Sequence, residues 1–482
     1  MKRSSIVYFL FLLSGITALV YEIVWARMLT LVFGHTIFSV SIVLAAFMTG
    51  LGFGSYYFGH VIDHIDNEIK YLDGDSFKEN LTEGSRPDNP LLIYGYIEIL
   101  IFLTCSIVSL VLFKFPDIYS WLSYFVPESV VIQNTVKALL AFALMLIPAF
   151  LMGATLPTIS KYFISDNTKI CSQVGVLYGI NTLGAALGCF LTGFFLVATF
   201  GVLQTVLSAA IINLFIGICA IRIYQESGGV LKRIRVPRLA RFSFKWEGEH
   251  NVWLAVSFVC GFTALAYEVI WSRLLVFSIA STVYSFSMML GVFLLGIMLG
   301  SLLVVTLSRS NLNLRTVLIF LQAGIGLYVI GSLYNIDQLL SAPWNGYNLQ
   351  KPIFVFSRYF LDSSALMLLP AIGLGMSFPI LVKMISSGCK HIGKETGQIY
   401  GVNTLGAIAG SLLTGFLLIP KLGTQQSLLL VATLNLLMML FLFRTGDYFT
   451  KTLRKVMTVV LAGVILIVNV GVPPDLLDRF FM

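Results

Sequence analysis

Apolar runs of about 20 residues or more recur along the whole chain, and shorter polar segments separate them. The runs are continuously apolar and lack the alternation of apolar and polar residues that marks the strands of a membrane β-barrel. Backbone polar groups inside a bilayer must be paired within the protein, so these runs predict transmembrane α-helices. We predict them at residues 6–32, 36–58, 91–113, 130–153, 171–199, 201–222, 252–278, 281–307, 315–334, 356–382, 396–420 and 425–444.

A further apolar helix is predicted near the C-terminus, at residues 455–471. Two amphipathic stretches, 117–126 with Trp121 and 338–348 with Trp344, are too short to cross a bilayer. Either could lie at the membrane surface or re-enter the membrane. The pattern predicts an all-α integral membrane protein with about 12–14 transmembrane helices.

The composition supports this assignment, because 57% of the 482 residues are hydrophobic and only 11% are charged. No segment has the strand–turn–helix pattern of a nucleotide pocket, so we expect no catalytic residues and no cofactor, and we lean against an enzyme. The six cysteines include no C-x-x-C pair and the five histidines are dispersed. We therefore expect neither a disulfide framework nor a metal site.

Basic residues gather in alternate loops, all on the side of Lys2 and Arg3. Such loops face the cytoplasm in membrane proteins, so we predict a cytoplasmic N-terminus. The net charge of +8 then reflects membrane topology, and we expect no nucleic acid as a partner. The 60–90 segment holds eight acidic and three basic residues and is expected to be a solvated cytoplasmic loop, with partner docking as the alternative.

The chain contains an internal duplication. Segment 15–28 (GITALVYEIVWARM) matches 261–274 (GFTALAYEVIWSRL) at an offset of 246 residues. Segment 175–194 (GVLYGINTLGAALGCFLTGF) matches 397–416 (GQIYGVNTLGAIAGSLLTGF) at an offset of 222. Polar and aromatic residues recur in register, which chance similarity among apolar helices does not produce. The matched residues include Tyr21, Glu22, Trp25 and Arg27, which recur as Tyr267, Glu268, Trp271 and Arg273.

Each copy contains six predicted helices, so the copies have the same orientation and form a parallel repeat. We predict a first six-helix unit at 1–222, a basic cytoplasmic linker at 223–251, a second unit at 252–444, and an extra helix with a short tail at 445–482. Two such bundles around a midplane site are typical of secondary transporters, although duplication can also build a scaffold.

Three motifs carry a resemblance to a known family. They are the Y-E-x-x-W-x-R helix, the G-A-T-L-P turn at 153–157 and the Y-G-x-N-T-L-G-A helix. Together they resemble the membrane region of the bacterial fused transporter-like/spermidine synthase family, over roughly residues 6–475. The resemblance implies a major-facilitator-like fold in a bacterial cytoplasmic (inner) membrane, and a soluble aminopropyltransferase-like domain after the helices.

The chain departs from that family in two places. The soluble domain would begin about where the sequence ends, at Met482, so no aminopropyltransferase domain is expected here. The loop signature Gly-x-x-x-Asp-Arg/Lys-x-Gly-Arg of the major facilitators is not found after the second helix, where Gly54 to Phe58 leads into the acidic loop.

Ionisable residues inside a bilayer are costly and are candidates for function. Four of them are paired by the repeat and could form structural ion pairs or bind a substrate or proton: Glu22, Arg27, Glu268 and Arg273. We expect Glu22 to pair with Arg273, and Glu268 with Arg27, at the outer side. Glu98 has Gln322 as its counterpart and no obvious partner, so it is a candidate for binding a cation or proton, or a buried hydrogen-bonded acid.

Other repeated residues are predicted to pack helices or to form hydrogen bonds between them. Trp25 and Trp271 also fit an aromatic belt at the membrane surface. The set comprises Tyr21, Trp25, Tyr267, Trp271, Asn181, Asn403, Thr182, Thr404, Gly184, Gly188, Gly406 and Gly410.

Three functions agree with these observations. The first is a transporter-like protein that moves a small cationic solute; only the family resemblance suggests a polyamine. The second is a membrane anchor or scaffold for a separate soluble synthase-like partner. The third is the membrane half of an aminopropyltransferase whose catalytic domain is not in this chain. The lipid bilayer is the one partner expected in all three.

Overall fold

The described part of the chain is helical throughout. The computed structural model describes residues 3–33, 36–72, 89–164, 166–227, 248–279, 283–310, 312–336, 352–445 and 463. The first half contains α1 (Arg3–Phe33), α2 (Thr36–Leu72), α3 (Asn89–Phe113), α4 (Phe115–Leu122), α5 (Val130–Gly153), α6 (Thr155–Phe163), α7 (Ile170–Leu191), α8 (Val197–Phe200) and α9 (Val202–Glu226). The second half contains α10 (Gly248–Ile279), α11 (Val283–Leu307), α12 (Leu314–Tyr334), α14 (Pro352–Ile385), α15 (Ile392–Leu413) and α16 (Ile419–Thr445).

Eleven helical segments of the described chain are long and apolar enough to cross a membrane. The last one, Ile392–Thr445, contains Gly423, whose φ of 78° interrupts the helix. A residue with positive φ cannot continue a right-handed helix, so this segment makes two crossings and each half has six. The prediction of an integral membrane protein with two six-helix units is confirmed. The predicted helix at 455–471, apart from residue 463, lies outside the described residues.

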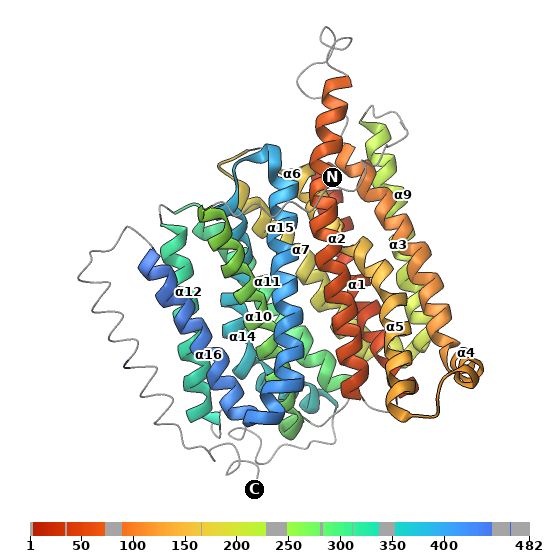
Figure 1. Ribbon diagram of the computed structural model, residues 1–482. Helices are drawn as coiled ribbons and strands as arrows, with labels where there is room; N and C mark the ends of the chain where they lie inside the picture. The colour runs from red at the N-terminus through yellow and green to blue at the C-terminus, as the bar shows by residue number, and fades with distance from the viewer. Residues whose placement is uncertain are drawn as a thin grey trace.

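The expected solvated loop at 60–90 is partly wrong. Helix α2 continues to Leu72, and Val61, Ile62 and Asp63 are buried. Its end projects beyond the bundle in Figure 1. The helix continues past Phe58 because its next turn, residues 59–63, packs against α15 in the second half. Three other predicted segments lie outside the described residues: 73–88 of the acidic loop, 228–247 of the linker and the stretch 338–348.

The two halves repeat each other in detail. Helices α7 and α15 begin and end at an offset of 222 residues, and both continue into a π-helical turn, Thr192–Leu196 in one and Thr414–Leu418 in the other. After that turn, Gly201 and Gly423 adopt φ of 79° and 78°. Glycine reaches this region without the Cβ clash that other residues meet, and so ends the helix in both copies.

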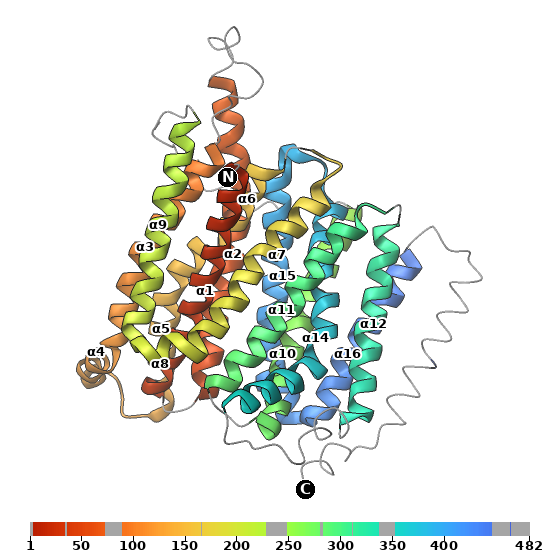
Figure 2. The ribbon, with the colours of Figure 1, turned by 180° about the vertical axis from the view of Figure 1, so that it is seen from behind.

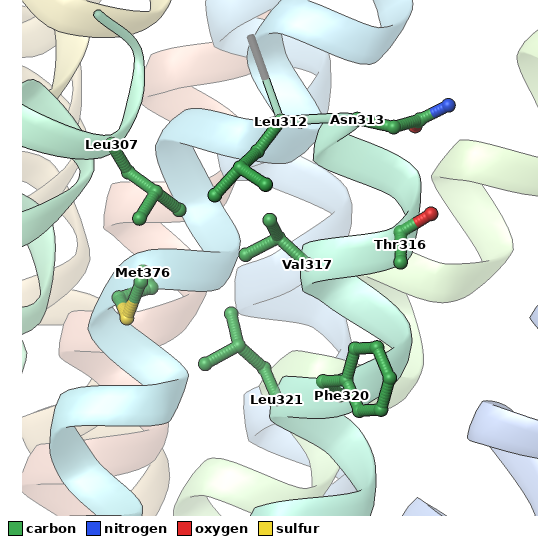
Figure 3. Close-up of a pocket in the computed structure, with 8 residues that line it drawn as sticks. All are labelled: Leu307, Leu312, Asn313, Thr316, Val317, Phe320, Leu321 and Met376. Carbon is green, nitrogen blue, oxygen red and sulfur yellow. The ribbon is translucent and has the colours of Figure 1, made fainter. Parts of the chain in front are cut away.

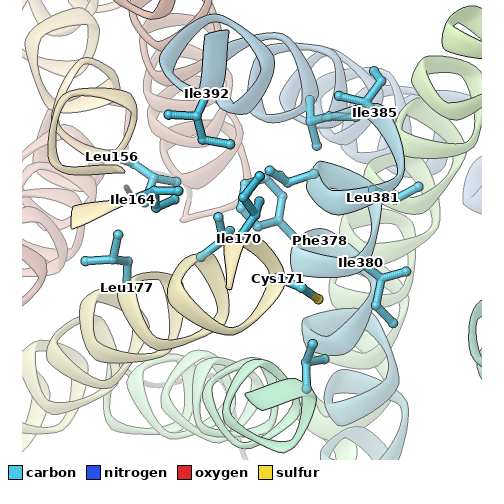
Figure 4. Close-up of a cluster of buried hydrophobic side chains, with 14 of the residues drawn as sticks. Leu156, Ile164, Ile170, Cys171, Leu177, Phe378, Ile380, Leu381, Ile385 and Ile392 are labelled. Carbon is cyan, nitrogen blue, oxygen red and sulfur yellow. The ribbon is translucent and has the colours of Figure 1, made fainter. Parts of the chain in front are cut away.

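Two pairs of helices make the most extensive contacts between the halves. Helix α2 packs against α15, and α7 packs against α11, as Figures 1 and 2 show from opposite sides. At the end where α1 begins, which we call the Arg3 end, a continuous apolar cluster crosses the interface (Figure 4). Leu156, Ile170 and Leu177 of the first half meet Phe378 and Ile392 of the second. The halves therefore share a core at this end.

Helix α4 lies at the side of the bundle, at the end opposite the N-terminus (Figure 1). Its Phe115 and Tyr119 are buried, and Lys137 of α5 lies 4.7 Å from the centre of the Tyr119 ring. Trp121 points outward and is 64% exposed. An amphipathic helix with an exposed tryptophan fits the membrane surface, in agreement with the interfacial alternative for 117–126.

Candidate functional site at the axis between the halves

Two equivalent glutamates lie near the axis that relates the halves. Glu22 on α1 is 7% exposed, and Glu268 occupies the same repeat position on α10. The two carboxyl groups are close enough for their charges to act on each other. Both charges also act on Cys189 of α7, whose side chain is fully buried. The two acids thus face one region from opposite halves.

Two equivalent tyrosines border the same region. Tyr178 of α7 and Tyr400 of α15 are half-buried and lie on either side of Phe378 of α14. The ring centres of Tyr178 and Phe378 are 4.5 Å apart, and those of Phe378 and Tyr400 are 5.8 Å apart. The hydroxyl of Tyr400 lies within electrostatic reach of Glu22. We call Glu22, Glu268, Tyr178 and Tyr400 the axial site.

The predicted crossed ion pairs are not formed. In the described chain no ion pair joins Glu22 or Glu268 to a basic side chain, and Arg27 and Arg273 are exposed. Each arginine follows its glutamate by five positions, which turns the two side chains to different faces of one helix. The rotation of α1 and α10 brings the two glutamates toward each other and leaves the arginines outside.

Glu98 has a partner that the sequence did not reveal. Asn213 of α9 donates a hydrogen bond from Nδ2 to Glu98 Oε2 at 2.6 Å, and the Tyr21 hydroxyl donates to Asn213 Oδ1 at 2.8 Å. All three side chains are buried. The Tyr21–Asn213–Glu98 triad ties together α1, α9 and α3.

The second half contains the same arrangement with an amide in place of the acid. Tyr267 donates to Asn435 Oδ1 at 2.7 Å, and Asn435 Nδ2 donates to Gln322 Oε1 at 2.6 Å. Asn213 and Asn435 are separated by 222 residues, so the repeat offset could have identified both. The sequence signal for these triads is one asparagine that recurs at the same position in two otherwise apolar helices.

The tryptophans beside these triads are not at the membrane surface. Trp25 and Trp271 are both fully buried, which corrects the aromatic-belt alternative. The indole Nε1 of Trp25 donates to Ser109 Oγ at 2.9 Å, whereas the Nε1 of Trp271 has no hydrogen-bond partner among the described residues. The position equivalent to Ser109 in the second half is Leu333.

The remaining repeated residues lie at helix contacts. Asn403 donates to the carbonyl of Ser257 on α10 at 3.0 Å, and Thr404 donates to a carbonyl of its own helix. Asn181 presents its carbonyl to α1, and Thr182 is buried beside it. Asn181 thus lies where α7 meets α1, Asn403 where α15 meets α10, and Thr404 where α15 meets α2.

The predicted packing glycines bring the same helices together. Gly184 and Gly188 of α7 face α1, and Gly406 and Gly410 of α15 face α10. A Cβ atom added to Gly184 would lie 2.1 Å from the carbonyl oxygen of Leu12. No side chain fits there, so the two backbones can approach only with glycine at this position.

The halves are fastened to each other at the Arg3 end. Asp63 near the end of α2 pairs with Lys161 of α6 at 2.7 Å, and both side chains are nearly buried. The other carboxylate oxygen of Asp63 accepts a hydrogen bond at 2.8 Å from the backbone N–H of Lys394, in the first turn of α15. A carboxylate is favourable at a helix N-terminus, and here it links the first half to the second.

Two equivalent lysines cross between the halves at the same end. Lys161 reaches the Cys389 carbonyl oxygen at 3.5 Å, and Lys383 donates to the Asn167 carbonyl oxygen at 2.8 Å. Both lysines and both carbonyl groups are related by the offset of 222. The Cys389 N–H also donates to Asn167 Oδ1 at 2.7 Å. These hydrogen bonds join the two halves at the Arg3 end.

The full facilitator loop signature is not found after the second helix, but Asp63 belongs to a part of it. Gly59-His60-Val61-Ile62-Asp63 contains its Gly-x-x-x-Asp part, one turn beyond the predicted end of the second helix. A Cβ atom on Gly59 would lie 2.6 Å from the carbonyl oxygen of Gly393 on α15. The basic residue that would follow the aspartate is replaced by His64, and Lys161 supplies the positive charge instead.

A pocket of about 420 Å³ lies elsewhere, between α11, α12 and α14 (Figure 3). Leu307, Val317, Leu321 and Met376 make it apolar. It contains none of the axial residues and lacks the charged groups needed to orient a polar solute.

No protein-family model matches the chain, and no curated protein matches it. Solved structures do resemble it. The proton:xylose symporter XylE, of the major facilitator superfamily, aligns with a TM-score of 0.53 at 11% identity, over 92% of this chain and 96% of that one. The chain has the major facilitator fold. A bacterial homologue of the iron transporter ferroportin, in an outward-facing state, aligns with a TM-score of 0.54 at 12% identity, over 92% of this chain and 99% of that one.

At this level of identity the likeness establishes the fold, and the chain is a multi-pass membrane protein in contact with the lipid bilayer. Within the facilitator fold, the axial site lies between the two six-helix units, and the fastened Arg3 end closes one side of the interface between them.

Within the described chain Trp25 forms a hydrogen bond through its indole and Trp271 does not, so their substitution should reduce stability by different amounts. Trp25→Phe should lower the free energy of unfolding by about 1 kcal/mol more than Trp271→Phe, because only the first change breaks a hydrogen bond and leaves a buried Ser109 hydroxyl unpaired. Thermal unfolding of both variants in one detergent measures the difference. Equal midpoints, or a larger loss for Trp271→Phe, would contradict the assignment.

Proposed function

We propose that the chain is a secondary transporter that binds a small organic cation at the axial site. The observation that supports this is the pair of equivalent carboxyl groups, Glu22 and Glu268, which lie between the halves without a basic partner in the described chain. Two carboxyl groups held close together are stabilised by a positive charge placed between them.

The neighbouring groups suit an ammonium ion. Tyr178 and Tyr400 add two phenol rings, whose faces attract cations, and two hydroxyl oxygens that can accept hydrogen bonds from N–H groups. A solute with two amino groups would place one near each carboxylate. Polyamines have this chemistry, and the family resemblance points to them as well.

The same proposal includes the orientation. The basic loops support a cytoplasmic Arg3 end, and the family resemblance supports a bacterial inner membrane. With that orientation, the hydrogen bonds at the Arg3 end would close the cytoplasmic side of the interface between the halves. Residues 1–222 and 252–444 would be the two moving units, and 223–251 the linker between them. A soluble synthase-like partner rests on the family resemblance alone.

Transport of a labelled diamine tests the proposal. Proteoliposomes containing the Glu22→Gln/Glu268→Gln variant should take up radiolabelled putrescine at least tenfold more slowly than the wild type, because the buried counter-charges are lost. The matched control is Glu128→Gln, an exposed acid just before α5. Uptake by the double variant at the wild-type rate would refute the proposal.

The crossed lysines should control access from the Arg3 end. In a cysteine-free protein with Tyr178→Cys as reporter, Lys161→Ala/Lys383→Ala should increase labelling by a membrane-impermeant maleimide in inside-out vesicles several-fold. The change removes both crossed bonds and the partner of Asp63. Lys169→Ala, which removes an exposed ion pair with Asp166 in the same loop, is the control. Unchanged labelling of the double variant would contradict this role.

A further inference from the structure

The two buried triads differ at one position, and the difference concerns a proton. Asn213 donates to Glu98 Oε2 just as Asn435 donates to Gln322 Oε1, and the two distances are both 2.6 Å. The other carboxyl oxygen of Glu98, Oε1, therefore occupies the position that the amide nitrogen of Gln322 has in the second triad. That nitrogen is a donor.

The amide nitrogen of Gln322 has acceptors around it. It lies 3.4 Å from Ser377 Oγ and 3.6 Å from Cys260 Sγ. Ser14 occupies the repeat position of Cys260 and flanks Glu98, together with Tyr94. Glu98 Oε1 has no hydrogen bond of ordinary geometry among the described residues. A protonated oxygen here would match the donor at the equivalent amide.

No positive charge is available to an ionised Glu98. Its side chain is fully buried, and α9 contributes the uncharged Asn213. The titratable groups that act on it are Tyr21 of α1 and Tyr94 and Cys105 of its own helix, all of which are uncharged at neutral pH. An isolated carboxylate buried in a low-dielectric interior costs far more than a neutral acid.

We propose that Glu98 is a proton-binding site, at which a neutral carboxylic acid replaces the glutamine of the second triad and holds α3 to α1 and α9. The proton belongs to the triad and is separate from the cation at the axial site. Of the alternatives that the sequence left open for Glu98, the proposal keeps the proton and the buried hydrogen-bonded acid and drops the cation. The proposal does not depend on transport.

Infrared difference spectra of the full chain in nanodiscs at pH 7 test this directly. The parent is Glu22→Gln/Glu268→Gln, so that the axial acids do not contribute. Adding Glu98→Gln should remove one carbonyl band of a protonated carboxyl group, a band that shifts in D₂O. Loss of an ionised carboxylate band in its place would overturn the proposal.

The second half supplies an independent variant in case Glu98→Gln does not fold. Gln322→Glu should fold and add one protonated carboxyl band, because it copies the first triad into the second. A Gln322→Glu protein that unfolds, or whose new band is that of a carboxylate, would count against the proposal.

Proton linkage gives a third measurement. Unfolding exposes the Glu98 carboxyl to water, where it ionises and releases its proton above about pH 4.3. The unfolding midpoint of Glu98→Gln should therefore exceed that of the wild type by an amount that grows from pH 5 to pH 8. A difference that stays constant or shrinks over this range would show that Glu98 is already ionised in the folded protein.

Discussion

A carboxyl group inside a bilayer needs a proton, a cation or an opposing side chain, and the arrangement of Glu22, Glu98 and Glu268 follows from that constraint. Glu98 lies within one half, in a closed triad that asparagine and tyrosine complete. Glu22 and Glu268 lie between the halves, where each half supplies one acid and the described chain supplies no base. If both carboxyl groups are to stay buried side by side, their charge must therefore be neutralised by bound protons or by a bound cation. This is the property expected of a site that must be loaded and emptied.

The duplication explains the features that the two halves share, and the positions at which the halves differ are candidates for function. Both halves keep the tyrosine and asparagine of the triad, the π-helical turns and the crossed lysines. They differ at Glu98, whose counterpart is Gln322, and at Asp63, whose counterpart is Arg309. Asp63 can fasten to the N-terminal turn of α15, whereas an arginine at that position would be repelled by a helix N-terminus. The closure of the Arg3 end is thus built on a symmetric pair of lysines and one asymmetric aspartate.

Much of the fold follows from the sequence because apolar length and repeated motifs are strong signals in a membrane protein. The helices of both halves and their equivalence were predicted in this way. Contacts between helices were not, because they depend on how each helix rotates about its axis. The Glu22–Arg273 pairing assumed that α10 presents its arginine side to α1, whereas the glutamate sides of both helices face the axis. Asp63 was assigned to a solvated loop because hydropathy ends the helix at Phe58, although the helix continues and packs against α15 as far as Asp63.

The central claim is that a cation binds between Glu22 and Glu268. Carbodiimide labelling of the purified chain, mapped by mass spectrometry with and without putrescine, tests it at the residues themselves. The account predicts that putrescine protects both axial glutamates from labelling and leaves the exposed Glu128 unprotected. Labelling of Glu22 and Glu268 that is unchanged by saturating putrescine and by related diamines would contradict it.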